Sequence, residues 1–184
     1  MPVPDHDADE RIVWQGDYIT AKTRGRWEYV GRPRNIRAAV ILAVDAQDHV
    51  LLVEQYRVPL GKYCIELPAG LIGDEAEFDG EDPLAAAGRE LEEETGYRAA
   101  VLEDLGCFWS SPGMVSESFT LVRASQLAKV GEGGGGGGSE PMGACLLADS
   151  ARTSRLDRQG ARFDHVQHRR HHRQLRHGRS VDCR

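Results

Sequence analysis

The sequence has few cysteines and no long apolar run, and both absences exclude classes of protein. Only 4 cysteines occur among 184 residues, and their spacing fits neither a zinc site nor the disulfide framework of a small secreted protein. No apolar stretch approaches the length needed to cross a membrane. The first ten residues, MPVPDHDADE, are acidic and polar, unlike a secretory signal. We therefore expect a cytoplasmic protein without a membrane partner.

Positive charge is also scarce, except at the C-terminal end. The first 140 residues carry a net charge of −12 and the remainder +6, which gives −6 for the chain. An acidic body argues against general nucleic-acid binding. Taken literally, the terminal sequence DHVQHRRHHRQLRHGR is a basic arm for an anionic partner or a histidine cluster for a transition metal.

The basic end has another interpretation, which concerns the reading frame of the gene. Its histidine, arginine, glutamine and leucine codons can all begin with C, and reading one base later can turn residues 168–177 into an apolar segment. The run GEGGGGGGSE implies a G-rich stretch of DNA, where a base is easily gained or lost. We favour a frameshift near residues 132–141 over a genuine basic tail.

The length fits one main domain with a small sheet before it. Within residues 1–35, the segment WQGDYITAKTRGRWEYVGRPR predicts a hairpin that turns at TRGR. Residues 36–140 form the main domain, with strands expected at about 37–44 and at VLLVEQYR. Residues 141–184 form an atypical Arg/His-rich tail, either frameshifted or disordered.

The stretch EDPLAAAGRELEEETGY, residues 81–97, predicts a helix with an unusual amount of like charge. Asp82 is a good N-cap, Pro83 suits the first helical position, and Gly96 suits the left-handed residue that closes a helix. The helix should therefore run from about 83 to 95.

One face of this helix gathers three carboxylates, because Glu90, Glu93 and Glu94 lie three and four residues apart. Like charges at this spacing destabilise a helix by about 0.2–0.5 kcal/mol per pair, and the C-terminal end of a helix disfavours anions. A cation should compensate. Either the face is solvated and Arg89 pairs with Glu93, or it binds a hard cation such as Mg²⁺.

These residues resemble the Nudix box, in which glycine, five residues, glutamate and seven residues precede the pattern R-E-apolar-x-E-E-x-G-apolar. The second half matches at every specified position from Arg89 to Tyr97. The first half departs, because ten residues separate Gly70 from Glu81. We interpret residues 75–79 as a loop insertion, which costs little loop entropy.

The resemblance implies an α/β fold, the Nudix α/β/α sandwich, and a hydrolase that cuts a diphosphate linked to a variable group. The segments EQYR, ELPAG and SSPGMVSE are similar to the ADP-ribose pyrophosphatase branch. The implied reaction is Mg²⁺-dependent hydrolysis of ADP-ribose, or a related nucleoside diphosphate sugar, to AMP and a sugar phosphate. The alternatives are another nucleoside diphosphate-linked substrate and an inactive nucleotide-binding protein.

The resemblance also implies roles for individual residues. The metal, Mg²⁺ or Mn²⁺ in its place, would be held by three carboxylates and one backbone carbonyl: Glu90, Glu93, Glu94 and Ala69. Arg89 belongs with the catalytic residues. The general base would come from a glutamate beyond the box, with Glu140 the first choice and Glu132 the second. Glu117 would help to hold the metal-bound water or the substrate.

Substrate contacts are expected before and after the helix. Arg57 suits a bidentate phosphate contact and, equally well, a pair with Glu66 across strands. The resemblance implies an N-terminal sheet exchanged across a homodimer, with Trp27 or Tyr29 stacked on adenine; packing of these rings on the main domain is the alternative. Pro112 completes the substrate-binding set.

Overall fold

The computed structural model describes residues 3–33, 36–72, 81–134 and 142–149, the last of these as backbone alone. The chain divides into two compact units. The first draws on Met1–Ile41, Ala69–Glu90 and Leu102–Arg123, and the second on Leu42–Pro68, Leu91–Val101 and Ala124–Arg184.

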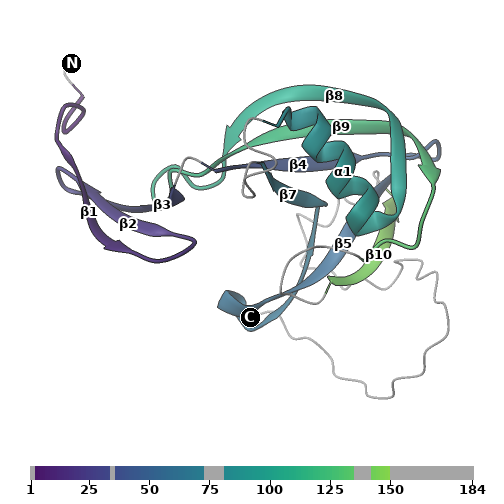
Figure 1. The fold of residues 1–184 in the computed structure, drawn as a ribbon, viewed down its shortest axis with the longest axis horizontal. Helices are drawn as coiled ribbons and strands as arrows, with labels where there is room; N and C mark the ends of the chain where they lie inside the picture. Colours follow the sequence, from purple (N-terminus) through teal and green to yellow (C-terminus); the bar gives the residue numbers. More distant parts are fainter. Residues whose placement is uncertain (1–2, 34–35, 73–80, 135–141, 150–184) are drawn as a thin grey trace. The chain divides into compact units, whose positions relative to one another are not determined.

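The N-terminal strands form an antiparallel sheet in the order β1-β2-β3 (Figure 1). Its members are β1 (Glu10–Gln15), β2 (Thr20–Arg24) and β3 (Trp27–Gly31). The expected hairpin is confirmed, because β2 pairs with β3 from Thr20↔Gly31 to Arg24↔Trp27. Gly25 has a φ of 57°, which suits a turn that a side chain would strain. Strand β1, whose residues are all exposed, extends the sheet beyond the expected hairpin.

A four-stranded sheet has the order β7-β4-β9-β8. Its members are β4 (Arg37–Ala43), β7 (Ala69–Ile72), β8 (Tyr97–Trp109) and β9 (Ser118–Lys129). Alternation along β4 buries one face completely, because Ala39, Ile41 and Ala43 have no exposed surface. The predicted strand at about 37–44 is therefore confirmed.

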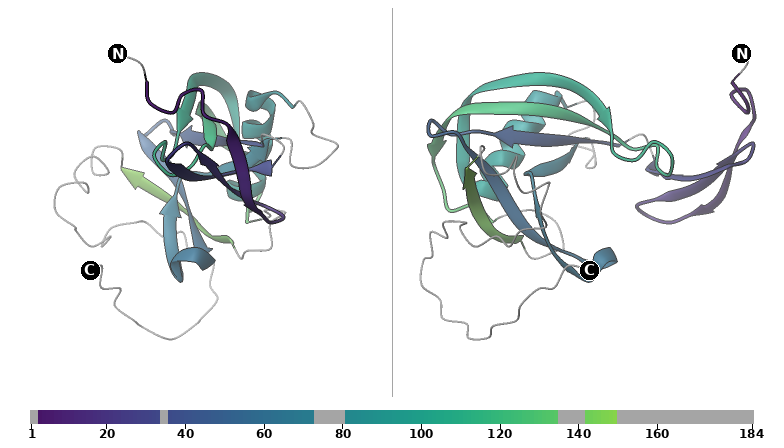
Figure 2. Two further views of the ribbon diagram at one scale, coloured as in Figure 1. Left: turned by 90° about the vertical axis from the view of Figure 1, so that its left-hand side faces the viewer. Right: turned by 180° about the vertical axis from the view of Figure 1, so that it is seen from behind.

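A second three-stranded sheet has the order β10-β5-β6 (Figure 2). It contains β5 (His49–Arg57), β6 (Lys62–Glu66) and β10 (Met142–Asp149). Residues 50–53 of β5 are buried on both faces, as expected for a continuous apolar run. A 3₁₀ turn, Val58–Leu60, joins β5 to β6 and ends at Gly61, whose φ is 63°. The sheet includes a strand, β10, that follows residue 140, the expected end of the main domain.

The predicted charged helix is α1, Pro83–Thr95. Its first backbone hydrogen bond runs from Ala86 N to Asp82 O, and Gly96 closes it with a φ of 70°. Across residues 3–33, 36–72, 81–134 and 142–149, α1 is the one α-helix, so a second helical layer is not part of what the structure describes. Within the same ranges, no helix has the length and apolar character needed to cross a membrane.

Candidate active site

The carboxylate face of α1 lies at the edge of its buried side. Ala87 and Leu91 are completely buried, and Glu94, three residues after Leu91, is only 8% exposed. Glu90 and Glu93 are partly buried. The apolar residues therefore fix the rotation of the helix, and Glu90, Glu93 and Glu94 follow along the border of the buried face.

Arg89 supplies part of the cationic compensation that the helix requires. Its Nη1 donates to Glu90 Oε1 at 2.8 Å, and its Nη2 lies 3.3 Å from Glu81 Oε2. Burial alone would lower the pKa of Arg89, but the carboxylates of Glu81 and Glu90 outweigh this effect and raise its pKa. The guanidinium remains charged and holds Glu90 from one side.

The remaining glutamate of the run, Glu92, points to a different partner. Arg98 donates two hydrogen bonds to its carboxylate, each 2.8 Å long. Both side chains are well exposed, so the pair contributes little to stability. Because its carboxylate is engaged by Arg98, Glu92 differs from the three metal-ligand candidates and is a suitable control residue.

Strand β7 passes directly beside the carboxylate of Glu90. A Cβ atom built at Gly70 would collide with Cδ, Cγ and Oε1 of Glu90. Ala69 precedes this contact and pairs with Val40 of β4. The glycine therefore permits the backbone around Ala69 to approach the helix at the position where a carbonyl ligand was expected.

The donor atoms at this rim fit a hard divalent cation. Among the residues that the structure describes, no three acidic, histidine or cysteine side chains already form a metal cluster. Mg²⁺ does not need such a cage, because it commonly keeps several waters and takes one or two carboxylates plus substrate phosphates. The carboxylate oxygens on α1, and the close approach of the Gly70 backbone to Glu90, are compatible with that mode of binding.

Arg57 and Glu66 contact each other through a bidentate pair. Arg57 Nε lies 2.9 Å from Oε1 and Nη2 lies 2.7 Å from Oε2. The pair with Glu66, which the sequence left open as an alternative to a phosphate contact, is present in the structure. A phosphate contact by Arg57 stays a prediction. About a third of each side chain is exposed, so solvent still reaches the pair.

Glu117 is held by a residue that sequence reasoning did not single out. Arg32 Nε donates to Glu117 Oε1 at 2.8 Å. The two chain segments also form a short parallel ladder, in which Val30 N donates to Met114 O and Ser116 N donates to Val30 O, both at 2.9 Å. The segment that carries Pro112 and Glu117 is therefore fastened to the end of β3.

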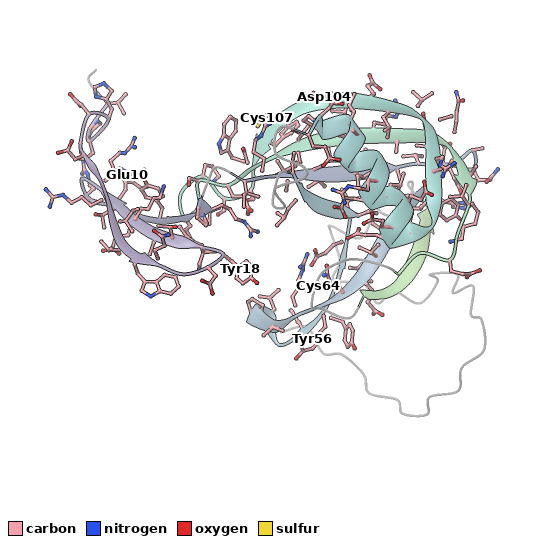
Figure 3. All side chains as sticks on the ribbon, viewed as in Figure 1. Glu10, Tyr18, Tyr56, Cys64, Asp104 and Cys107 are labelled. Carbon is pink, nitrogen blue, oxygen red and sulfur yellow. The ribbon has the colours of Figure 1, made fainter. Side chains whose placement is uncertain are left out.

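A pocket of about 370 Å³ opens beside this ladder. It brings together Trp27, Tyr29 and Pro112, which were predicted to bind substrate, and adds Trp109 and Arg24. The Tyr29 hydroxyl donates to Glu10, and burial followed by this hydrogen bond raises the pKa of Tyr29. Glu10 begins β1, whereas Tyr18 lies in the loop between β1 and β2 (Figure 3). Trp109 could not be identified from local spacing, because it follows β3 by roughly eighty residues.

Of the two candidates for the general base, the structure describes only Glu132. Glu140 lies outside the described residues. Glu132 is exposed, and its backbone oxygen lies 3.4 Å from Lys129 Nζ. Both assignments stay predictions.

The strands and the carboxylate-bearing helix α1 of the described residues agree with the expected Nudix fold. Residues 34–132 match the NUDIX domain family, and the chain belongs to that family. The expected Nudix fold is thereby confirmed.

Individual relatives agree with this assignment. The chain is 42% identical over 96 residues to the methanol dehydrogenase activator of Bacillus methanolicus, which covers 52% of this chain and 49% of that protein. It is 38% identical over 95 residues to the ADP-ribose pyrophosphatase of Bacillus subtilis, with coverage of 52% and 49%. The chain thus spans about half the length of these curated relatives. A crystal structure of an ADP compounds hydrolase superposes with a TM-score of 0.65 at 26% identity, covering 82% of this chain and 81% of that one.

Proposed function

We propose that the protein hydrolyses the diphosphate of ADP-ribose, or of a closely related nucleoside diphosphate sugar, to AMP and a sugar phosphate. The observation that carries this proposal is the rim of α1, where Glu90, Glu93 and the buried Glu94 follow the Nudix pattern. Similarity to an ADP-ribose pyrophosphatase of Bacillus subtilis and to an ADP compounds hydrolase supports an ADP-containing substrate.

The chemistry requires neutralisation of phosphate charge, an aligned water and a base. Bound Mg²⁺, or Mn²⁺, would supply charge neutralisation and a more acidic water. Glu90, Glu93, Glu94 and the Ala69 carbonyl would hold the metal, while Arg89 orients Glu90 through their 2.8 Å hydrogen bond. Glu140, or Glu132 in its place, would accept the proton.

The other residues would bind and orient the two ends of the substrate. Arg57 presents a planar guanidinium already ordered by Glu66, which suits a phosphate oxygen pair. The aromatic pocket would take the nucleobase between its rings, because base stacking on aromatic side chains contributes about 1–3 kcal/mol per base. Glu117, held by Arg32, would orient the substrate near this pocket.

We further infer a homodimer that uses the N-terminal sheet. Ile12, Val13 and Trp14 of β1 are 58%, 63% and 56% exposed. These side chains leave apolar surface exposed on β1 that a second copy could cover. Light scattering of the chain and of an Ile12→Asp variant tests this inference, since a dimer of the wild type should become a monomer in the variant.

The decisive experiment measures AMP release from ADP-ribose with and without Mg²⁺. Glu94→Gln should reduce turnover more than about 100-fold, because it removes a ligand charge from the metal. Glu92→Gln is the matched control, since Glu92 pairs with Arg98 and should stay within twofold of the wild type. Binding of ADP-ribose without any AMP release would favour an inactive nucleotide-binding protein.

A further inference from the structure

The C-terminal end of α1 contacts the segment that carries Glu132, the second candidate for the general base. This segment, Lys129 to Gly134, begins at the last residue of β9 and ends before the range that the structure does not describe. We call it the helix clamp. Its contacts with residues 94–97 lie within the second compact unit.

Lys129 contributes the charged part of the helix clamp. Its Nζ donates to the backbone oxygen of Thr95, the last residue of α1, at 2.8 Å. The same ammonium lies 4.7 Å from the centre of the Tyr97 ring, a distance at which a cation–π attraction operates. A cation is therefore fixed at the negative end of the helix dipole.

The backbone of the helix clamp supplies three further donors. Val130 N and Gly131 N both donate to Gly96 O, at 2.8 and 3.1 Å. Gly134 N donates to Glu94 O at 2.9 Å. The last carbonyls of a helix have no partner inside the helix, and here they are satisfied by residues about 35 positions away in sequence.

Glycine is required at the closest approach. Gly133 has a φ of 72°, and a Cβ atom there would collide with the backbone of Glu94, Thr95 and Gly96. A Cβ atom at Gly96 would in turn collide with the carbonyl of Gly131. The two chain segments are thus in backbone contact, which any side chain at Gly96 or Gly133 would prevent.

We propose that Lys129 is a positioning residue, and that the helix clamp holds the last turn of α1 so that Glu93 and Glu94 stay in place to bind a divalent cation. The inference rests on the proposed function, because it assumes that these glutamates hold the metal. Last turns of helices fray readily, and the last turn of α1 carries two of the three ligand carboxylates. Preorganisation by a neighbouring residue is how outer-shell groups tune metal affinity.

The sign of the effect separates positioning from simple electrostatics. If Lys129 acted only through its charge, its removal would strengthen the binding of a cation, because a repulsive charge would be lost. If Lys129 acts by holding the helix end, its removal weakens binding, because the carboxylates must be ordered at the moment the metal binds.

The test measures Mn²⁺ affinity by titration calorimetry for the wild type, Lys129→Met, Lys129→Arg and Arg123→Met. The methionine keeps the length of the lysine stem without its charge or donors, and we expect it to weaken Mn²⁺ binding by about tenfold. Lys129→Arg keeps a charged donor and should stay within about threefold of the wild type. Arg123→Met removes one charge from an exposed position on the same strand and should leave the affinity unchanged.

A second measurement needs no metal. Hydrogen exchange followed by NMR reports whether the amides of Val130, Gly131 and Gly134 are protected in the metal-free protein. Lys129→Met should speed their exchange about tenfold, whereas the amide of Gly61, which bonds within its own turn, should not change.

The outcomes distinguish this inference from the proposed function. If the wild type binds no Mn²⁺, the metal site itself is wrong. If the wild type binds Mn²⁺ and Lys129→Met binds it equally well or more tightly, Lys129 does not position the ligands and the inference is overturned. Weaker binding in Lys129→Met, with recovery in Lys129→Arg and faster exchange of the clamp amides, supports it.

Discussion

Arg57 and Glu66 meet diagonally across two strands rather than as direct neighbours. The register pairs Arg57 with Lys62 and Val53 with Glu66, yet Arg57 donates to both carboxylate oxygens of Glu66, at 2.9 and 2.7 Å. The arginine side chain is long enough to span this diagonal, and its planar guanidinium keeps a fixed orientation against the carboxylate. The pair therefore presents an ordered cation at the end of β5.

Arg57→Lys should raise the KM for ADP-ribose by about tenfold, because an ammonium cannot reproduce bidentate contacts. The free energy of unfolding should fall by no more than about 1 kcal/mol, since the pair is partly exposed. Steady-state kinetics and urea unfolding measure the two effects. An unchanged KM would show that Arg57 does not bind the substrate.

Trp27→Leu and Trp109→Leu should each raise the Kd for AMP by about tenfold, because each removes a ring from the pocket of about 370 Å³. Titration calorimetry with AMP measures this change. Tyr18→Leu is the control, because Tyr18 is 77% exposed and does not line that pocket. Equal loss in all three variants would place the nucleobase elsewhere.

Gly70→Ala should weaken Mn²⁺ binding by about tenfold or more, because its methyl group would collide with the Glu90 carboxylate. Calorimetry at constant pH measures the affinity. Gly113→Ala is the comparison for this readout, since a Cβ atom there has open space around it. Unchanged Mn²⁺ affinity in Gly70→Ala would mean that Glu90 does not need its present position.

Asp45→Asn should destabilise the turn between β4 and β5 at neutral pH. The Asp45 carboxylate accepts hydrogen bonds from the backbone amides of Gln47 and His49, both at 2.8 Å. Burial alone would raise the pKa of Asp45, but these bonds and the His49 ring outweigh it and lower the pKa. We expect a loss of about 1–2 kcal/mol in the free energy of unfolding at pH 7.

The pH dependence of this loss follows from the direction of the pKa shift. A lowered pKa means that the stabilisation is fully present above the unfolded value, near 3.9, and disappears as pH falls through the lower folded value. Urea unfolding at pH 7 and pH 3 should therefore show a smaller difference between Asp45→Asn and the wild type at the lower pH. Asp48→Asn, at an exposed left-handed position that Asn tolerates, is the control.

The structure and the sequence agree where the signal is local. Both ends of α1 could be predicted, because the residues that signal them stand at the ends themselves. Asp82 and Pro83 stand where the helix begins, and Gly96 follows its last residue. The short apolar run at residues 38–43 likewise indicated the strand that is β4. The choice for Arg57 stayed open in the sequence, because its residue type suits a carboxylate and a phosphate equally.

The contacts that sequence reasoning missed join distant parts of the chain. Lys129 and Thr95 are 34 residues apart, and Arg32 and Glu117 are 85 apart. No periodicity or turn signal links such positions, since only the folded sheet brings them together. The cations that contact the glutamate-rich helix illustrate this difference. Arg89 and Arg98 lie near its glutamates in sequence, whereas Lys129 is 34 residues from the end of the helix.

The helix clamp has a consequence for inheritance. Its last contact, from Gly134 to Glu94, precedes most of the glycine codons, where replication slippage is most frequent in a repetitive tract. A lineage that gained or lost a base after the codon of Gly134 would acquire a different carboxyl-terminal segment while keeping the helix clamp unchanged. The four hydrogen bonds that the helix clamp makes to residues 94–96 would then be the same in both descendants.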